Sequence, residues 1–436
     1  MQDAIEGASG SAVRDALVGT FRRLIKLYFR DIERLGEPPA SDTRGRVFVS
    51  NHTNALIDPV VVMTDAKCAI SPVAKSTLWN IPGLAWLLDR AGAVPIVRRK
   101  DTPDKDASAN NAVFDKIAAH LSSGGNILIF PEGTSHSEPH LAPLRTGAAR
   151  MLVAANERNG VPLTFQAVAL EFDRRTEFRS RALVLWGPVR RLADVSGATD
   201  EERVTSITAQ MKTDLEELLV EGETKADRMR IARVAEMYAN DAGESSLGAW
   251  SDIGRRVELA QKTLRSQSSV DARLVARAIE TIDAYCAELE RLGVTDAQVA
   301  GVEPPPPSTM PRWRRALLAP LAASGFALYA LPYFLPRWLA RNSDPDATST
   351  YKLGAALVVY PVWAAGLVGA SLALLPPPLS LVGAGVALAS PFAALHWLDE
   401  IYQRRPELSA DDRASLLRLR MFARTAIDEA RSRLPA

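Results

Sequence analysis

Short apolar runs alternate with amphipathic segments through the first half of the chain. The runs are bounded by Gly, Pro or Asn, which is typical of β-strands; they lie at 47–49, 94–97, 126–130, 163–172 and 182–186. Between them, apolar residues recur at helical spacing in the segments 59–65, 82–89, 110–122 and 146–159. This alternation predicts an α/β layer architecture.

The segment before the first of these strands has an amphipathic helical pattern. Apolar residues recur from Val13 to Leu35, and basic residues fill other positions. Two interpretations fit this N-terminal part, residues 1–40: the helix packs on the following domain, or it lies on an anionic membrane surface. Residues 1–11 are polar and acidic without an apolar core, so we expect no secretory signal and a cytosolic active region.

The middle of the chain predicts a helical appendage followed by a spacer. The segments 199–240 and 254–292 are long, charged and poor in Gly and Pro, as in solvent-exposed helices. The prolines of 303–311 cannot continue a helix and stiffen the chain into an extended linker. We therefore expect a first domain at 41–240, a helical appendage at 241–302 and a proline-rich linker at 303–311.

After this linker the composition becomes strongly apolar. The stretch 353–398 contains no charged side chain and is interrupted by three consecutive prolines at 376–378. A membrane span needs about 20 apolar residues. We therefore predict a C-terminal membrane hairpin, with spans at about 353–375 and 378–398, inside a membrane region at 312–400 and before a cytosolic tail at 401–436.

An earlier uncharged stretch at 316–336 is interrupted by three prolines. Arginines precede this stretch and others follow the last span, so both flanks are expected in the cytosol by the positive-inside rule. An even number of crossings satisfies both flanks, which favours a re-entrant or interfacial segment over a third span. We expect an integral membrane protein with a cytosolic catalytic domain; a buried core hairpin in a soluble protein is the alternative.

Composition and charge exclude several other classes. The chain has 436 residues and a net charge of +1, which gives no global field to attract nucleic acid. Its two cysteines, Cys68 and Cys286, are far apart in sequence and support neither a disulfide framework nor a metal cluster. A reducing compartment is expected.

A histidine and a carboxylate follow the strand at 47–49. The imidazole of His52 can take a proton from an attacking hydroxyl, while a carboxylate on its other nitrogen fixes the tautomer. Asp58 precedes Pro59, which predicts an N-cap after an irregular turn. A cap alone is the simpler interpretation of Asp58, and a carboxylate can serve both purposes.

Two further segments could bind an anion. The loop 130–137 leaves a strand and contains Gly133, with Arg145 downstream, so it could hold an oxyanion or a phosphate. The segment 92–100 ends in Arg98-Arg99-Lys100, whose planar guanidinium groups suit a phosphate. Taken singly, each segment could also be a solvated strand end.

Together these segments resemble the four ordered blocks of the glycerolipid acyltransferase superfamily. The matching segments are Asn51-His52 with Asp58, then 92–98, 130–133 and 161–163. The resemblance covers roughly residues 45–190, about one domain in length. It implies an acyltransferase-type mixed sheet flanked by helices, an acyl-CoA or acyl-carrier-protein co-substrate, and no metal or organic cofactor.

The resemblance also implies residue roles. His52 would be the general base, Asp58 its partner, Arg98 a phosphate ligand, and Glu132 and Gly133 part of the acceptor site. The full set of substrate-binding candidates is Asn51, Arg98, Arg99, Glu132, Gly133, Ser135, His136 and Arg145.

Two departures from the superfamily pattern bear on the acceptor. Five residues instead of four separate His52 from Asp58, and Ser135 stands where an arginine is common. Both features resemble the branch that includes fungal glycerol-3-phosphate and dihydroxyacetone-phosphate acyltransferases, in which Arg145 is the candidate to replace that arginine.

The expected function is acyl transfer to the hydroxyl of glycerol 3-phosphate or dihydroxyacetone phosphate in phospholipid biosynthesis. The expected partners are this phosphorylated acceptor, an acyl thioester and membrane lipid, without nucleic acid. Acylation of lysophosphatidate or another lysophospholipid is the alternative within the class. A non-catalytic lipid-binding membrane protein that retains the fold is the alternative from another class.

Overall fold

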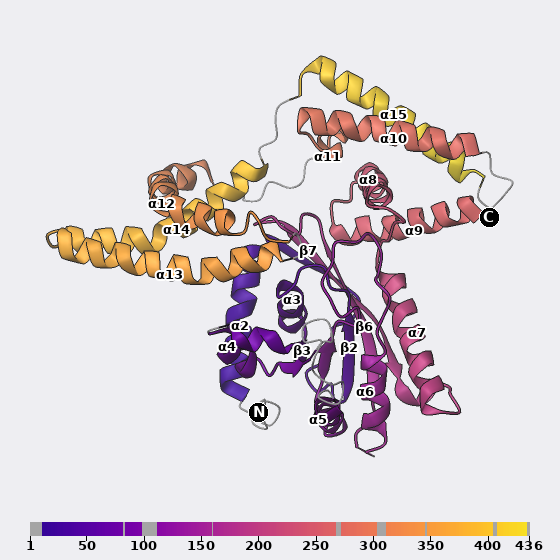
Figure 1. The fold of residues 1–436 in the computed structure, drawn as a ribbon. Helices are drawn as coiled ribbons and strands as arrows, with labels where there is room; N and C mark the ends of the chain where they lie inside the picture. The colour runs from indigo at the N-terminus through magenta and orange to yellow at the C-terminus, as the bar shows by residue number, and fades with distance from the viewer. Residues whose placement is uncertain are drawn as a thin grey trace. The chain divides into compact units, whose positions relative to one another are not determined.

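A computed structural model describes the protein at residues 11–81, 83–97, 111–158, 160–266, 272–302, 311–344, 347–403 and 408–433 (Figure 1). It divides into two compact units, Met1–Lys225 and Ala226–Ala436. The division falls inside the segment 41–240 that the sequence suggested as one domain. The reason is that Val234 and Met237 share buried apolar clusters with later helices of the second unit.

The first unit is built on one seven-stranded sheet in the order β1-β7-β6-β2-β5-β3-β4. The strands are β1 Asp31–Leu35, β2 Arg46–Ser50, β3 Ser71–Lys75, β4 Val94–Ile96, β5 Ile127–Ile129, β6 Thr164–Phe172 and β7 Arg181–Arg191. Neighbouring strands are parallel except for β6 and β7, which are antiparallel. The predicted mixed α/β sheet is therefore confirmed.

Helices cover both faces of this sheet. They are α2 Ser11–Tyr28, α3 Ile57–Asp65, α4 Leu84–Arg90, α5 Asn111–Ser122, α6 Gly147–Asn156 and α7 Asp200–Leu218, with short 3-10 helices η2 Ser76–Asn80 and η4 Leu192–Asp194. Figure 1 shows α2, α3 and α4 on one side of the sheet and α6 and α7 on the other. Because strand side chains alternate between faces, Val47 and Val49 join the core beneath α5, α6 and α7, whereas Phe48 contacts Trp186.

The five strands expected from the sequence are present, but β1 and β3 were missed. The amphipathic helix was predicted to reach Leu35, and this was wrong: α2 ends at Tyr28 and Asp31–Leu35 pairs with β7. Ile25 and Phe29 are buried at this end of the helix, so α2 packs on the domain, as the first of the two interpretations expected.

The second unit is helical throughout its described part. Its helices are α8 Lys225–Asp241, which begins at the last residue of the first unit, α9 Leu247–Ser266, α10 Ala272–Leu292, α11 Asp296–Ala300, α12 Arg312–Leu339, α13 Thr348–Leu374, α14 Leu379–Gln403 and α15 Ala410–Arg431. The segment 199–240, read from the sequence as one long helical stretch, is divided between α7 and α8. Of the linker predicted at 303–311, residues 303–310 lie outside the described residues.

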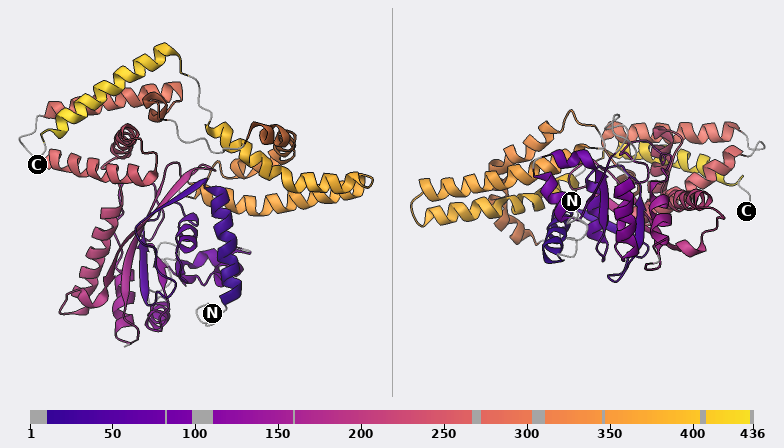
Figure 2. Two further views of the ribbon diagram at one scale, coloured as in Figure 1. Left: turned by 180° about the vertical axis from the view of Figure 1, so that it is seen from behind. Right: turned by 60° about the horizontal axis from the view of Figure 1, so that its bottom comes forward.

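Three helices are long and apolar enough to cross a membrane: Ala316–Leu339, Thr348–Leu374 and Leu379–Leu398. α13 and α14 form the expected antiparallel hairpin (Figure 2), and Ser371 packs against Gly383 close to the turn. α12 runs through its three internal prolines as one helix, so a third span has the length it needs. The number of crossings stays a prediction.

A buried ion pair joins α15 to the helices that precede the membrane segments. The Arg420 guanidinium donates from Nε to Asp296 Oδ1 (2.8 Å) and from Nη2 to Asp296 Oδ2 (3.1 Å). Tyr285 Oη and Asn240 Nδ2 also donate to this carboxylate, at 2.6 and 2.8 Å. With Asp296 only 1% exposed, α8, α10, α11 and α15 meet around one carboxylate.

We expect Arg420→Met to lower the free energy of unfolding by about 3–5 kcal/mol, because it leaves the Asp296 carboxylate buried without its cation. Arg418→Met, two residues away on the exposed side of α15, is the matched control and should change stability by less than about 0.5 kcal/mol. Denaturant unfolding of the full chain in detergent measures both. Equal effects of the two substitutions would contradict this account of the ion pair.

Candidate active site

Three loops meet at one edge of the sheet. β2 is flanked by β5 and β6, and both pairs are parallel. The loops that follow these strands therefore leave the same carboxyl edge, where open α/β sheets bind their ligands. The loop after β2 carries His52, the loop after β5 carries Glu132, and the loop after β6 carries Arg175.

The Asp58 carboxylate organises the first loop. Asp58 is fully buried, and its Oδ2 lies 2.9 Å from His52 Nδ1 while accepting backbone N–H bonds from Thr53 (2.8 Å) and Asn54 (2.7 Å). The structure therefore brings His52 and Asp58 together, as the sequence suggested, and their catalytic roles stay predictions. The predicted N-cap is wrong, because α3 begins at Ile57 and the carboxylate caps the preceding loop instead.

The loop accommodates its five intervening residues through a tight turn. Ala55 has a φ of 42°, in the left-handed region, and Ile57 N donates to Asn54 O at 2.9 Å. On a regular helix, a spacing of six positions would place the side chains of His52 and Asp58 on different faces. The turn instead brings the Asp58 carboxylate back under the loop, next to His52.

The His52 ring is held on two sides. It stacks on Phe130 with ring centroids 4.1 Å apart and an interplanar angle of 22°. A proton on Nδ1, donated to Asp58, leaves the lone pair on Nε2. The side chain is 19% exposed, and no described residue hydrogen-bonds Nε2, so this nitrogen can meet a substrate hydroxyl.

Glu132 and His136 hold the backbone of His52. The Glu132 side chain is buried, with Oε1 accepting from His52 N (2.8 Å) and Oε2 accepting from Ala142 N (2.8 Å) and paired with His136 Nε2. His136 N donates in return to His52 O at 3.0 Å. Both Glu132 oxygens are thus engaged within the protein, and the suggested substrate contacts of Glu132 and His136 stay predictions.

Asn51 also has a structural task. Its side-chain amide donates from Nδ2 to Leu170 O (3.0 Å) and accepts at Oδ1 from Leu170 N (2.8 Å). The pair fixes the start of the loop after β2 to β6. Asn51 is only 4% exposed, and its proposed substrate contact is likewise untested.

Gly133 and Arg145 lie against each other in the loop after β5. Gly133 has a φ of 74°, and a Cβ placed there would lie 2.5 Å from Arg145 Nε. Arg145 N donates to Pro131 O at 2.8 Å, while its exposed guanidinium has no hydrogen bond or ion pair with a described residue. Ser135 is half-buried in the same loop. Arg98 and Arg99 lie outside the described residues.

Arg175 was not predicted as a site residue. Its Nη1 donates to Thr53 O at 3.1 Å, its Nη2 donates to Ser137 Oγ, and its own carbonyl accepts from Asn54 Nδ2 at 3.2 Å. It therefore ties the His52 loop to the Glu132 loop. The only sequence signal was a group of arginines in the turn between two strands, which is common in solvated turns.

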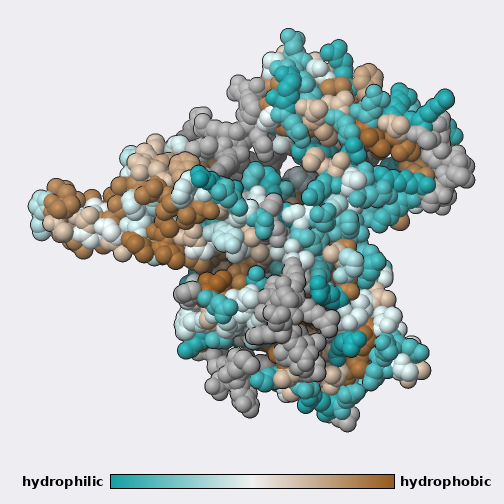
Figure 3. All heavy atoms as spheres, viewed as in Figure 1, coloured by the Kyte–Doolittle hydropathy of each residue, from teal (hydrophilic) through white to brown (hydrophobic). Residues whose placement is uncertain are grey.

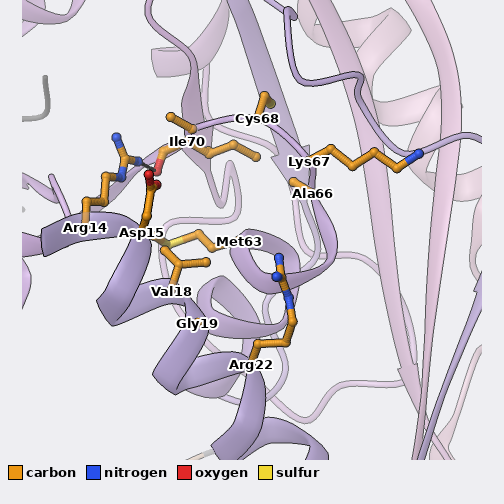
Figure 4. A pocket seen from close by; sticks show the side chains of 11 residues that line it. Arg14, Asp15, Val18, Gly19, Arg22, Met63, Ala66, Lys67, Cys68 and Ile70 are labelled. Carbon is orange, nitrogen blue, oxygen red and sulfur yellow. Dashed lines mark hydrogen bonds between the residues drawn. The ribbon is translucent and has the colours of Figure 1, made fainter. Parts of the chain in front are cut away.

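A separate cavity of about 250 Å³ lies between α2 and the chain that leads into β3 (Figure 4). Residues 66–70 precede a parallel strand, so this cavity is at the amino edge of the sheet, opposite His52. Arg14 and Arg22 line it and donate to the carbonyls of Ile70 and Thr64. Burial raises the pKa of the Cys68 thiol to about 11. The cavity holds none of the predicted site residues.

Comparison with known proteins defines the class. Residues 28–169 match the family model described as Acyltransferase. Glycerol-3-phosphate O-acyltransferase 2 of Saccharomyces cerevisiae is 23% identical over 279 residues, which cover 58% of this chain and 37% of the yeast protein. The chloroplastic 1-acyl-sn-glycerol-3-phosphate acyltransferase BAT2 of Brassica napus is 28% identical over 136 residues, covering 31% of this chain and 36% of the plant protein.

One solved structure is also similar. The crystal structure of the 1-acyl-sn-glycerophosphate (LPA) acyltransferase PlsC from Thermotoga maritima aligns with a TM-score of 0.34 and 15% identity, over 47% of this chain and 81% of that chain. In the two curated relatives, the matched region spans little more than a third of the protein's length, at 37% and 36%. The match to the Acyltransferase family model lies within the first unit, at residues 28–169.

We expect Gly133→Ala to reduce acyl transfer because the new methyl group must displace the Arg145 guanidinium. The sequence suggests Arg145 as a ligand of the acceptor phosphate, and losing that charged hydrogen bond of about 1.5–3 kcal/mol corresponds to roughly a 10- to 150-fold loss in kcat/KM. Gly243→Ala is a matched control, since Gly243 has nearly the same φ (73°) but no atom within 4 Å of its added Cβ.

The two substitutions should carry a similar backbone strain of about 1–2 kcal/mol, visible in thermal unfolding. Only Gly133→Ala should raise KM for the acceptor. An equal loss of kcat/KM in both variants would mean that the effect is general destabilisation. It would contradict a contact between Arg145 and the acceptor phosphate.

Proposed function

We propose that this protein transfers a fatty acyl group from acyl-CoA or acyl-carrier protein to the hydroxyl of glycerol 3-phosphate or dihydroxyacetone phosphate, in phospholipid biosynthesis. The pairing of His52 with the buried Asp58 carboxylate, at 2.9 Å, is the observation that supports it most directly. The match of residues 28–169 to the acyltransferase family supports the reaction type.

In the proposed reaction, His52 Nε2 removes the proton of the acceptor hydroxyl as the oxygen attacks the thioester carbonyl. Asp58 stabilises the imidazolium that forms. Backbone amides of the loop after β5 stabilise the oxyanion of the tetrahedral intermediate. As that intermediate collapses, the C–S bond breaks and the departing thiolate takes the proton from the imidazolium. The step needs no acyl-enzyme, metal ion or organic cofactor.

A phosphate on the acceptor would be bound by arginines. Arg145 is exposed beside Gly133, on the loop that also positions His52, and a guanidinium can bind a phosphate through two parallel hydrogen bonds. Arg98 and Arg99 are further phosphate ligands in this proposal, on the basis of the family resemblance. Glycerol 3-phosphate and dihydroxyacetone phosphate both carry a hydroxyl and a phosphate on one short skeleton.

Acylation of lysophosphatidate is the second candidate. It is favoured by the similarity to the Brassica napus protein, whose name gives 1-acyl-sn-glycerol-3-phosphate as the acceptor. The catalytic pair would act in the same way on this acceptor. A non-catalytic lipid-binding role is disfavoured, because burial of Asp58 under three donors maintains a geometry that lipid binding alone does not require.

We expect His52→Ala to lower kcat by about a hundredfold to ten-thousandfold, the usual contribution of a general base. His140→Ala is the control, because His140 is exposed and is not among the hydrogen-bond partners of His52 and Asp58. Acyl transfer is measured with a radiolabelled thioester at saturating acceptor. Full activity in a folded His52→Ala protein would exclude the proposed base.

A side-by-side assay of glycerol 3-phosphate, dihydroxyacetone phosphate and lysophosphatidate should show the highest kcat/KM with one of the first two. Arg145→Ala should raise KM for each phosphorylated acceptor by roughly tenfold or more, since it removes a charge-assisted hydrogen bond. A clear preference for lysophosphatidate would select the second candidate. Absence of turnover on all three would support the non-catalytic alternative.

A further inference from the structure

We propose that α12 does not cross the membrane, and that the chain enters and leaves the bilayer on the side of the catalytic unit. In this arrangement the α13–α14 hairpin is the anchor. α12 packs on this hairpin, where Trp363 Nε1 of α13 donates to Leu328 O at 2.8 Å, and both of its ends stay on the catalytic side, against an anionic lipid surface. Of the three helices that are long and apolar enough to cross, α13 and α14 do so in this arrangement and α12 does not.

The packing of α15 fixes the parity of the crossings. α15 follows all three candidate spans, yet it packs on helices that precede them. Leu416 and Ala423 are fully buried in apolar clusters with residues of α8 and α10. The carboxylate of Asp296, before the spans, holds Arg420, after them. Helices that share a buried core lie on one side of a membrane, so the number of crossings between them is even.

The direction of α12 relative to α14 supports the same conclusion. Successive crossings alternate in direction, so in a three-span arrangement α12 and α14 would run the same way. The contacts show instead that α12 and α14 run in opposite directions. Gly325 of α12 packs against Ser390 and Ala394 of α14, whereas Tyr329, one turn later in α12, donates from its hydroxyl to Ala387 O, earlier in α14, at 2.7 Å.

The ends of α12 have the character of a membrane surface. Residues 312–341 contain five arginines, at both ends of the helix, and no acidic residue. Trp313 and Trp338 are 65% and 55% exposed and each lies near an arginine, at 5.6 Å for Arg314 and 4.8 Å for Arg341. Arginine favours the cytosolic, anionic leaflet, and tryptophan favours the headgroup level. Both ends therefore suit the same surface.

The hairpin has the surface of a membrane anchor. In α13 none of the apolar window is buried inside the protein. Figure 3 shows apolar residues over the arm formed by α13 and α14, whereas polar residues predominate over α10 and α15. Exposed leucines and valines of this arm include Leu357, Val362, Leu374, Leu381 and Leu388.

The side of the catalytic unit follows from the chain itself. α7 and α8 are joined at 219–224, and the described residues before α12 contain no candidate span. The segments 267–271 and 303–310 are too short to cross a bilayer. The first unit is therefore on the same side as α8, and through the Asp296 ion pair on the same side as α15.

Cysteine accessibility tests this topology. Single cysteines are introduced at three exposed positions: Ser196→Cys in the first unit, Asn342→Cys between α12 and α13, and Ala414→Cys in α15. A membrane-impermeant maleimide is applied to spheroplasts and to inverted vesicles of the expression host. The unsubstituted chain is the blank, because burial raises the pKa of both Cys68 and Cys286 to about 11 and leaves little reactive thiolate.

All three cysteines should be labelled from one face and protected from the other, in protein that resists extraction with alkaline carbonate. Three crossings would instead place Asn342→Cys and Ala414→Cys on the face opposite Ser196→Cys. Crossing by α12 and α13 alone would place only Asn342→Cys on the opposite face. Either pattern, or release of the protein by carbonate, would overturn the proposal.

Discussion

The site depends on one buried carboxylate that accepts three hydrogen bonds. A charged group without exposure to water is costly unless it is hydrogen-bonded. In Asp58 it is Oδ2 that accepts from the His52 ring and from the amides of Thr53 and Asn54, whereas the buried Oδ1 has no hydrogen-bond partner among the described residues. The same contacts that make burial of the charge tolerable also fix the loop and the orientation of the imidazole. The hydrogen bonds that stabilise the buried carboxylate are therefore the same ones that position the proposed base.

Two further layers keep the loop in place. Asn51 joins it to β6, and Glu132 accepts from the His52 backbone while His136 donates back to it. Arg175 ties the loop to Ser137. Since β5, β2 and β6 are adjacent and parallel, these contacts come from three loops at one edge of one sheet. Arg145, whose exposed guanidinium makes no hydrogen bond or ion pair with a described residue, lies in the same group of loops.

The sequence predicted the α/β class, five strands and the His52–Asp58 pair, because apolar periodicity and a strand-end histidine are local signals. It did not predict the features that depend on contacts between residues far apart in the sequence. Asp31–Leu35 looks like a continuation of an amphipathic helix and becomes a strand only because β7 is available to pair with it. Glu132 reaches His52, Asn51 reaches Leu170 and Arg175 reaches Thr53 across at least 80 sequence positions, and no local pattern reveals these contacts.

Chemical rescue tests the central claim most directly. If the His52 imidazole acts as the base beside Asp58, then added imidazole should restore acyl transfer to the His52→Ala protein, with a rate that rises with the concentration of neutral imidazole. The same addition should leave the wild-type rate unchanged. A folded His52→Ala protein that transfers acyl groups at the wild-type rate without imidazole would contradict the account.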